Sequence, residues 1–235
     1  MKNVIVCSNC GTENAFFKLN CANCKAYIRT RIVNIDLWHT IYLLIESPVI
    51  AFQNIIQAEH KNFIIFLSFL IGIKFFLFAA VAASINNYSV NIESYFLSDM
   101  LIYIGYSFII LALFPYLMTK LNNLFGLQNR YKDNLAMYIY TFIPVLMSLA
   151  ILSPVHYALF GKYWFTYNPS PFLIKPAIAW VLSIIEVILV LWSVMLSVTA
   201  TYAQTRNKVY SFITGVGFWV ILILLFFYLP LLPFS

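Results

Sequence analysis

Charged residues are scarce in this chain of 235 residues, because Lys, Arg, Asp and Glu together make up 9% of it. An ordinary soluble domain carries about a quarter charged residues. Hydrophobic residues make up 63%, and a chain of this length cannot bury that much apolar surface in a core of its own. Intrinsic disorder is excluded too, since it requires low hydrophobicity and high charge. The remaining class is an all-α polytopic membrane protein.

Motifs of known catalytic chemistry are also missing. The three histidines, His39, His60 and His156, are scattered, and neither H-E-x-x-H nor G-x-S-x-G occurs. The nearest enzyme-like combination is Ser107 in an apolar run together with His156. Nothing beside Ser107 resembles an oxyanion hole, so we interpret Ser107 as a helix-packing residue and His156 as a boundary residue near the outer face. The sequence predicts no enzyme.

Cysteine is absent after residue 24, and the four cysteines before it form two C-x2-C pairs separated by ten residues: Cys7, Cys10, Cys21 and Cys24. Two such pairs place four soft sulfur ligands around a tetrahedral site, which is the arrangement that Zn²⁺ prefers. Gly11 directly follows the first pair and suits its tight turn, whereas Lys25 stands at the equivalent place in the second. We predict one structural zinc per chain, with a closed shell and no catalytic position.

Two disulfides, two redox pairs or an iron site are the alternative interpretations of this cysteine pattern. The charge distribution described below places the segment in the cytosol, where disulfides are rare. Residues 1–30 are therefore expected to form a cytosolic zinc ribbon whose folding depends on the metal, because so small a unit has almost no core. We expect no signal peptide before it, since the first six residues are too few for one.

Long apolar runs dominate the chain from residue 62 to residue 235. A spanning helix needs about 20 such residues, and we expect five of them, at 63–85, 100–118, 135–160, 177–200 and 212–232. The third run is long enough to need tilt or a break at Pro144 or Pro154. No internal repeat is visible.

Basic residues are missing from the expected loop at 86–99 and from the tail after the last run. Eleven basic residues lie before the first run and in the loops at 119–134 and 201–211, against two in the loop at 161–176. Because Lys and Arg gather on the cytoplasmic side, this pattern predicts a cytoplasmic N-terminus and, with five spans, an outside C-terminus. We expect a multi-pass protein of the cell (inner) membrane.

Residues 34–61 have an intermediate composition and are expected to form two short helices before the first span. Asp36 is a plausible N-cap for the first helix, while Ser47 and Pro48 fit the cap and first position of the second. Phe52, Ile55 and Ile56 fall on one face of that second helix. This face suits either an interfacial helix on the cytoplasmic leaflet or a helix packed on the membrane bundle, and both remain open.

The same segment resembles the entry to the Yip family, the Ypt/Rab-interacting multispanning membrane proteins. Ser47-Pro48 is followed by Phe52 and Ile55 and then by a polar break before the first span. Asp36-Leu37-Trp38 is similar to the start of the family's Asp-Leu-Tyr-Gly-Pro, although His39 and Thr40 replace Gly-Pro. The resemblance covers roughly residues 36–232. A zinc ribbon ahead of such a domain looks like the prokaryotic type of the family. The resemblance implies five spans and a membrane-organising or trafficking-like role.

Two opposite charges, Lys74 and Glu186, lie midway through the first and fourth expected spans. A lone charge at the bilayer centre costs about 2.5 kcal/mol or more, so we expect both to face the bundle interior. A direct pair between them would require those two spans to be neighbours. The alternatives are that Lys74 reaches solvent along an inner groove, or that Glu186 is protonated and hydrogen-bonded to a Ser or Tyr.

We therefore predict a non-enzymatic membrane scaffold or adaptor whose zinc ribbon contacts a cytosolic protein. The alternative is a small transporter or channel-like bundle with a polar site around Lys74 and Glu186. The lipid bilayer is an expected partner, and self-association into a homo-oligomer stays open. Nucleic acid is disfavoured, because orientation in the membrane already accounts for the basic residues of the ribbon: Lys18, Lys25, Arg29 and Arg31.

Overall fold

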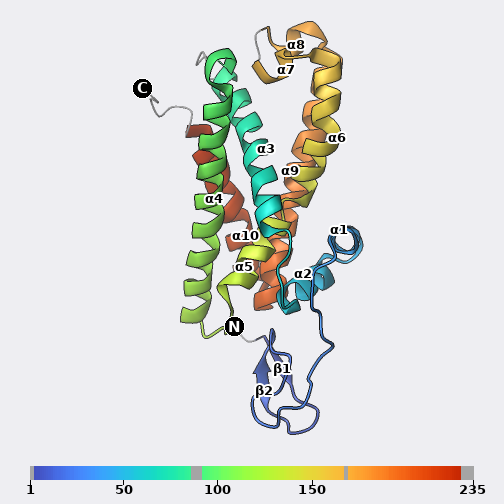
Figure 1. Cartoon of the computed structure of the whole chain (residues 1–235), viewed down its shortest axis with the longest axis vertical. Helices are drawn as coiled ribbons and strands as arrows, with labels where there is room; N and C mark the ends of the chain where they lie inside the picture. The colour runs from blue at the N-terminus through green and yellow to red at the C-terminus, as the bar shows by residue number, and fades with distance from the viewer. Residues whose placement is uncertain (1–2, 86–91, 167–168, 229–235) are drawn as a thin grey trace. The chain divides into compact units, whose positions relative to one another are not determined.

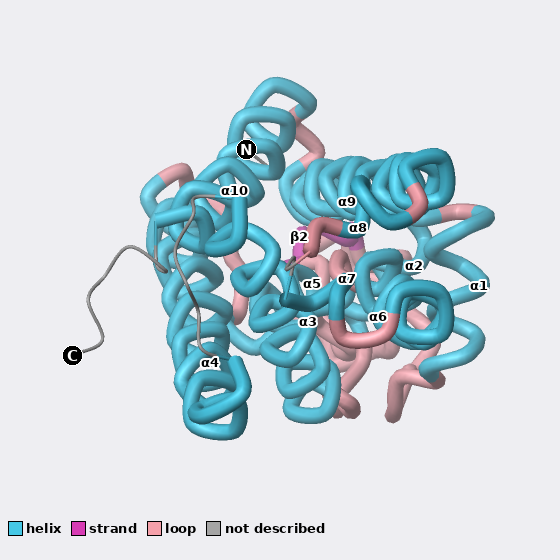
Figure 2. The backbone as a smooth tube through the Cα atoms, turned by 90° about the horizontal axis from the view of Figure 1, so that it is seen from above, coloured by secondary structure: helices cyan, strands magenta, loops and turns pink. Residues whose placement is uncertain are grey.

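The computed structural model describes residues 3–85, 92–166 and 169–228, and it is mainly helical (Figures 1 and 2). The chain divides into two compact units. The first unit consists of Met1–Ile64, Leu111–Thr141 and Met195–Val216. The second consists of Ile65–Ile110, Phe142–Val194 and Gly217–Ser235.

A small antiparallel hairpin opens the first unit (Figure 1). Strand β1 (Val4–Val6) pairs with β2 (Glu13–Ala15), with Ile5 opposite Asn14. The first cysteine pair lies in the turn between the strands, and the second follows β2. These elements and the turns around them form the expected ribbon, which has very little apolar core of its own.

Helices α1 (Leu37–Glu46) and α2 (Pro48–Gln57) follow the ribbon. Asp36 is confirmed as the N-cap of α1, because its carboxylate accepts the His39 backbone N–H at 2.9 Å. Pro48 is the first residue of α2, as expected. Ser47 is the N-cap residue of α2, as expected, although its side chain makes no capping hydrogen bond. The Ser47 carbonyl instead accepts the first helical hydrogen bonds of α2.

The apolar face of α2 packs against α5 (Tyr131–Tyr140), within the first unit. Phe52 and Ile55 are fully buried and Ile56 nearly so. Of the two interpretations of this helix, the structure favours packing on protein. Helix α1 differs from α2, because three large hydrophobic side chains on one of its faces are exposed: Trp38, Tyr42 and Ile45.

Four described helical stretches are long and apolar enough to cross a membrane: Met100–Leu124, Tyr131–Phe160, Pro176–Thr205 and Lys208–Leu225. They belong to α4 (Ile92–Leu124), to α5 with α6 (Ile143–Phe160), to α9 (Pro176–Thr205) and to α10 (Lys208–Tyr228). The expected first span coincides with α3 (Ile64–Ile85), which counts only as a shorter apolar helix over Ile64–Ala79. The count of five spans therefore stays a prediction.

Several helix boundaries differ from those expected. The third expected span is interrupted at Thr141 and Phe142, ahead of both candidate prolines. Pro144 sits in the first turn of α6, where its missing N–H costs no helical bond, and Pro154 lies inside the helix. Helix α4 begins at Ile92, inside the segment expected as a loop at 86–99.

The loop expected at 161–176 contains two short helices in the second unit, α7 (Tyr163–Thr166) and α8 (Pro171–Ile174). Elsewhere in that unit, Phe142 lies against three aromatic rings, with centroid distances of 4.9–5.8 Å to Phe75, Phe218 and Trp219. Edge and tilted contacts of this kind dominate apolar cores. The second unit therefore has a core built from helices far apart in sequence.

Close packing explains the role of Ser107. A Cβ on Gly72 of α3 would lie 2.8 Å from the Ser107 Oγ of α4 and 2.9 Å from the Ile104 backbone. Small residues that allow such close approach are typical of helix pairs in membranes. The Ser107 hydroxyl donates to the Ile104 carbonyl one turn earlier. The structure thus agrees with the interpretation of Ser107 as a packing residue.

Candidate functional site

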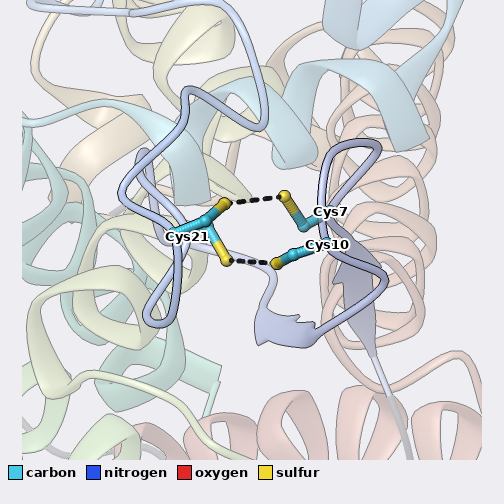
Figure 3. A group of neighbouring side chains, drawn as sticks. Cys7, Cys10 and Cys21 are labelled. Carbon is cyan, nitrogen blue, oxygen red and sulfur yellow. Dashed lines mark hydrogen bonds between the residues drawn. The ribbon is translucent and has the colours of Figure 1, made fainter.

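The four cysteines of the ribbon converge, with all four sulfur atoms within 4.8 Å of one another. The sulfur atoms of Cys7 and Cys24 are 3.6 Å apart, and those of Cys10 and Cys21 are 3.5 Å apart. Figure 3 shows Cys7 and Cys10 on one side of the cluster, with Cys21 facing them. A disulfide needs about 2.05 Å, whereas a tetrahedron with Zn–S bonds of about 2.3 Å separates its sulfurs by about 3.8 Å. The donor set therefore fits one tetrahedral Zn²⁺.

The two cysteine turns share one backbone shape. Gly11 and Lys25 each follow their pair with positive φ, of 69° and 62°. Each donates its N–H back to the first cysteine of its turn, Gly11 to Cys7 at 2.9 Å and Lys25 to Cys21 at 3.2 Å. Glycine adopts this conformation without strain, whereas a lysine carries a modest cost. Lys25 therefore occupies the same structural position as Gly11.

Two polar neighbours support the sulfur cluster. Hydrogen bonding with the Thr12 side chain, and secondly with its backbone, lowers the pKa of Cys10 to about 6. Thiolate is the form that binds metal. Buried Asn14 donates to Cys21 Sγ at 3.5 Å and accepts the Ala22 N–H at 2.8 Å, which ties the second turn to β2. Sequence reasoning missed Asn14, for which no spacing rule exists.

The ribbon is not a free module, because it is attached to helices of the first unit at two points. The Arg29 guanidinium donates to the Phe17 carbonyl of the ribbon and to the Gln57 carbonyl at the end of α2, at 2.9 and 2.8 Å. The Asn3 amide donates to the Ala203 and Gln204 carbonyls in the last turn of α9, at 3.1 and 2.7 Å. Both attachments use carbonyls that a helix end leaves unpaired.

A buried ionic network lies beside the first of these attachments. Lys61 Nζ is 3.0 Å from Asp133 Oδ1 and also donates to the carbonyls of Ile56 and Ala58, at 3.0 and 2.8 Å, and of Ile55. Arg130 forms two hydrogen bonds to the same carboxylate, at 2.7 and 3.0 Å, and its guanidinium lies 4.4 Å from the ring centroid of Phe17. The network therefore joins the end of α2, the start of α5 and the ribbon.

In the second unit, Lys74 of α3 and Glu186 of α9 lie together, with Nζ 2.7 Å from Oε1. Their side chains are 3% and 13% exposed. The ammonium also lies 4.6 Å from the ring centroid of Phe78. Of the arrangements that the sequence left open, the structure adopts direct pairing, which makes α3 and α9 neighbours at this point.

A cavity of about 190 Å³ adjoins this pair, lined among others by Ser153, His156, Trp164 and Ser183. His156 is 1% exposed and stacks on Trp164, with ring centroids 3.9 Å apart. Its Nε2 and the second carboxylate oxygen of Glu186 are buried and find no hydrogen-bond partner within the described part of the chain. His156, which the sequence suggested as a boundary residue near the outer face, is thus buried and lines this cavity.

These observations define a multi-pass helical membrane protein with a cysteine-rich ribbon at its start. The family model of the Yip1 domain matches residues 42–229. The chain belongs to the Yip1 domain family, as the entry motif suggested. The matched region begins within α1, so it includes the membrane helices and leaves out the ribbon. No curated protein and no solved structure matches the chain.

Proposed function

We propose that this protein is a non-enzymatic membrane scaffold or adaptor of the Yip type, whose zinc ribbon presents a binding surface to a cytosolic protein. The attachment of the ribbon by Arg29 and Asn3 is the observation that carries this proposal. A ribbon held in place offers a preorganised surface, and preorganisation reduces the entropy lost on binding. A freely tethered ribbon would lack that advantage.

The ribbon exposes large hydrophobic side chains that could contact a partner. Tyr27 is 73% exposed and Val6 is 60% exposed, although both belong to a folded unit. Tyrosine is among the residues that contribute most to protein interfaces. Zn²⁺ bound by the four cysteines would hold this surface in shape, and the charge distribution places it in the cytoplasm with the C-terminus outside.

Site-specific photocross-linking in native membranes tests the adaptor role. A photoreactive residue at position 27 of the full-length protein should give one discrete adduct, which Cys10→Ser should abolish. A probe at Trp38, which is equally exposed outside the ribbon, serves as the control and should not give that adduct. The proposal fails if the adduct persists in Cys10→Ser, or if both positions capture the same mixture.

Metal analysis and accessibility labelling test the parts of the proposal separately. Purified protein should contain about one Zn²⁺ per chain, and Cys7→Ser with Cys10→Ser should remove it without affecting membrane insertion. A single cysteine placed at Phe165 in a chain without native cysteines should react only from outside the cell. Labelling from the cytosol would overturn the proposed orientation.

A small transporter or channel-like bundle is the second candidate. The unpaired Glu186 oxygen and His156 nitrogen beside a cavity favour it, because buried polar atoms without partners are rare outside functional sites. The space suits only a small hydrogen-bonding solute or a few waters. Flux through reconstituted vesicles that Glu186→Gln abolishes would support this candidate, and an impermeable vesicle would eliminate it.

A further inference from the structure

A second, larger cavity lies in the first unit, where α9 meets the start of α10. Its volume is about 600 Å³, within the range of small-molecule sites, roughly 300–1,000 Å³. Val198 of α9, Val209 and Phe212 of α10 and Val49 of α2 form apolar walls. Neither the ribbon nor the Lys74–Glu186 pair contributes to it.

The walls of this cavity belong mainly to helices that are apolar enough to cross a membrane. Val209 and Phe212 are nevertheless 70% and 62% exposed. Side chains of this kind on a spanning helix face hydrocarbon or another helix. The interior of the cavity therefore suits an acyl chain.

The rim of the cavity is basic. Lys208 lines it and is exposed, and the adjacent Arg206 is exposed as well, with its guanidinium 5.9 Å from the ring centroid of Tyr202. None of the described lining residues is acidic. Lys208 is also the first residue of α10, whose N-terminal end favours negative charge. The rim is therefore complementary to an anionic headgroup.

The first unit carries an independent sign of the membrane interface. Trp38 and Tyr42 are exposed on the same face of α1. Their amphipathic rings are typical of the level of the lipid headgroups. The segment with Arg206 and Lys208 is expected on the cytoplasmic side, where anionic lipids are concentrated. The apolar walls, the basic rim and the expected cytoplasmic leaflet thus all suit the same kind of occupant.

We propose that the groove between α9 and α10 is a binding site for an anionic phospholipid, with one acyl chain against Val198, Val209 and Phe212 and the headgroup at Lys208. Zwitterionic lipid would fill the same walls but would gain nothing from the basic rim. A second copy of the chain is the competing occupant, because it could cover the apolar walls.

Native mass spectrometry and thermal unfolding of the full-length protein in detergent test this site. Phosphatidylglycerol should be retained and should raise the unfolding temperature more than phosphatidylcholine does. One basic residue near a membrane surface contributes about fivefold in affinity for anionic lipid. We therefore expect Lys208→Gln to weaken phosphatidylglycerol binding about fivefold and to leave phosphatidylcholine binding unchanged.

Lys120→Gln is the matched control, because Lys120 is a basic residue expected on the same side of the membrane but lies on α4, beside Tyr116. It should leave the lipid preference intact. Glycerol phosphate without acyl chains should have no effect. Equal losses in Lys208→Gln and Lys120→Gln, the absence of any lipid preference, or a dimer that excludes bound lipid would each overturn the proposal.

Discussion

Two buried ion pairs, one in each unit, differ in how completely their polar atoms are used. In the first unit, Lys61 and Asp133 are 4% and 1% exposed, and Arg130 together with three carbonyls at the end of α2 completes their hydrogen bonding. In the second unit, Lys74 and Glu186 lie 2.7 Å apart, but the second carboxylate oxygen of Glu186 has no hydrogen-bond partner among the described residues. The Nε2 atom of His156 beside them is likewise buried and unpartnered among the described residues.

The difference distinguishes a structural cross-link from a candidate site. Burying a charge is costly, and the cost is offset only when every donor and acceptor is satisfied. The Lys61–Asp133 network meets this condition and joins separate segments of the first unit. The Lys74–Glu186 pair does not meet it, and an unsatisfied buried group beside a cavity is typical of a place where water or a solute binds.

Asp133→Asn should cause the largest loss of stability. It keeps the shape of the side chain but leaves Lys61 and Arg130 without a counter-charge. Breaking a buried pair in this way costs about 3–5 kcal/mol. Denaturant or thermal unfolding in detergent measures the loss.

The control for Asp133→Asn is Glu59→Gln, which removes the partner of the 60% exposed Arg31 side chain. Exposed pairs contribute up to about 1 kcal/mol, so this variant should unfold almost like the unchanged protein. Equal losses from the two variants would contradict the distinction between the buried network and a surface pair.

Raising the pH should stabilise the folded state through Lys61. Burial is the main reason why the pKa of Lys61 falls to about 8, from a usual value of 10.5. Between about pH 8 and 10.5 the unfolded chain then binds more protons than the folded one, so the stability contributed by this group increases with pH. Below pH 8 both states are protonated and its contribution is constant.

Comparison with Lys61→Met isolates this effect, since all other groups titrate in both proteins. The stability of the unchanged protein relative to the variant should rise by up to about 1.4 kcal/mol per pH unit above about pH 8. Unfolding midpoints from about pH 7 to about pH 10 provide the measurement. A difference that stays flat over this range would mean that Lys61 keeps its usual pKa in the folded protein, and a difference that falls would mean that folding raises that pKa.

Some parts of this architecture could be predicted from sequence because they depend on local or strongly constrained features. The cysteine spacing anticipated a cluster of four sulfurs, and the cost of charge inside a membrane anticipated that Lys74 and Glu186 would face inward. Asp36 and Pro48 marked helix starts correctly. In each case a short pattern or a single large energy determined the outcome.

Other parts could not be predicted, because they depend on contacts between distant segments. Asn3 meets the end of α9, 200 positions away, and no periodicity signals this contact. Asp133 was assigned to a loop, whereas the structure buries it in the first turn of α5. For His156 a weak signal existed: Ser153 and His156, like Ser183 and Glu186, are three residues apart and share a helical face.

A double-mutant cycle measures how strongly the less satisfied pair is coupled. Lys74→Met or Glu186→Gln alone leaves a buried partner without its counter-charge, while the double variant removes both charges. We expect the double variant to be more stable than the sum of the single losses implies, with a coupling of about 1–3 kcal/mol. Thermal stability in detergent provides the measurement, and additive losses would mean that the two side chains do not interact.

Among the substitutions in the second unit, the smallest effect on stability is expected for His156→Phe. The imidazole Nε2 has no hydrogen-bond partner among the described residues, so its removal breaks no bond there, and a phenyl ring can keep the stacking on Trp164. A similar ring in the same cavity should change the free energy of unfolding by less than about 1.5 kcal/mol.

Asn122→Leu is the matched control: Asn122 is equally buried, but it donates to Gln204 at 3.0 Å and accepts from Tyr210 at 2.7 Å. Leaving those two partners unpaired costs about 1–3 kcal/mol for each buried group, so the control should lose clearly more than His156→Phe. The reverse order would mean that His156 holds the second unit together through a bound water or ion, which would make it a structural residue and remove the main support for a solute site beside Glu186.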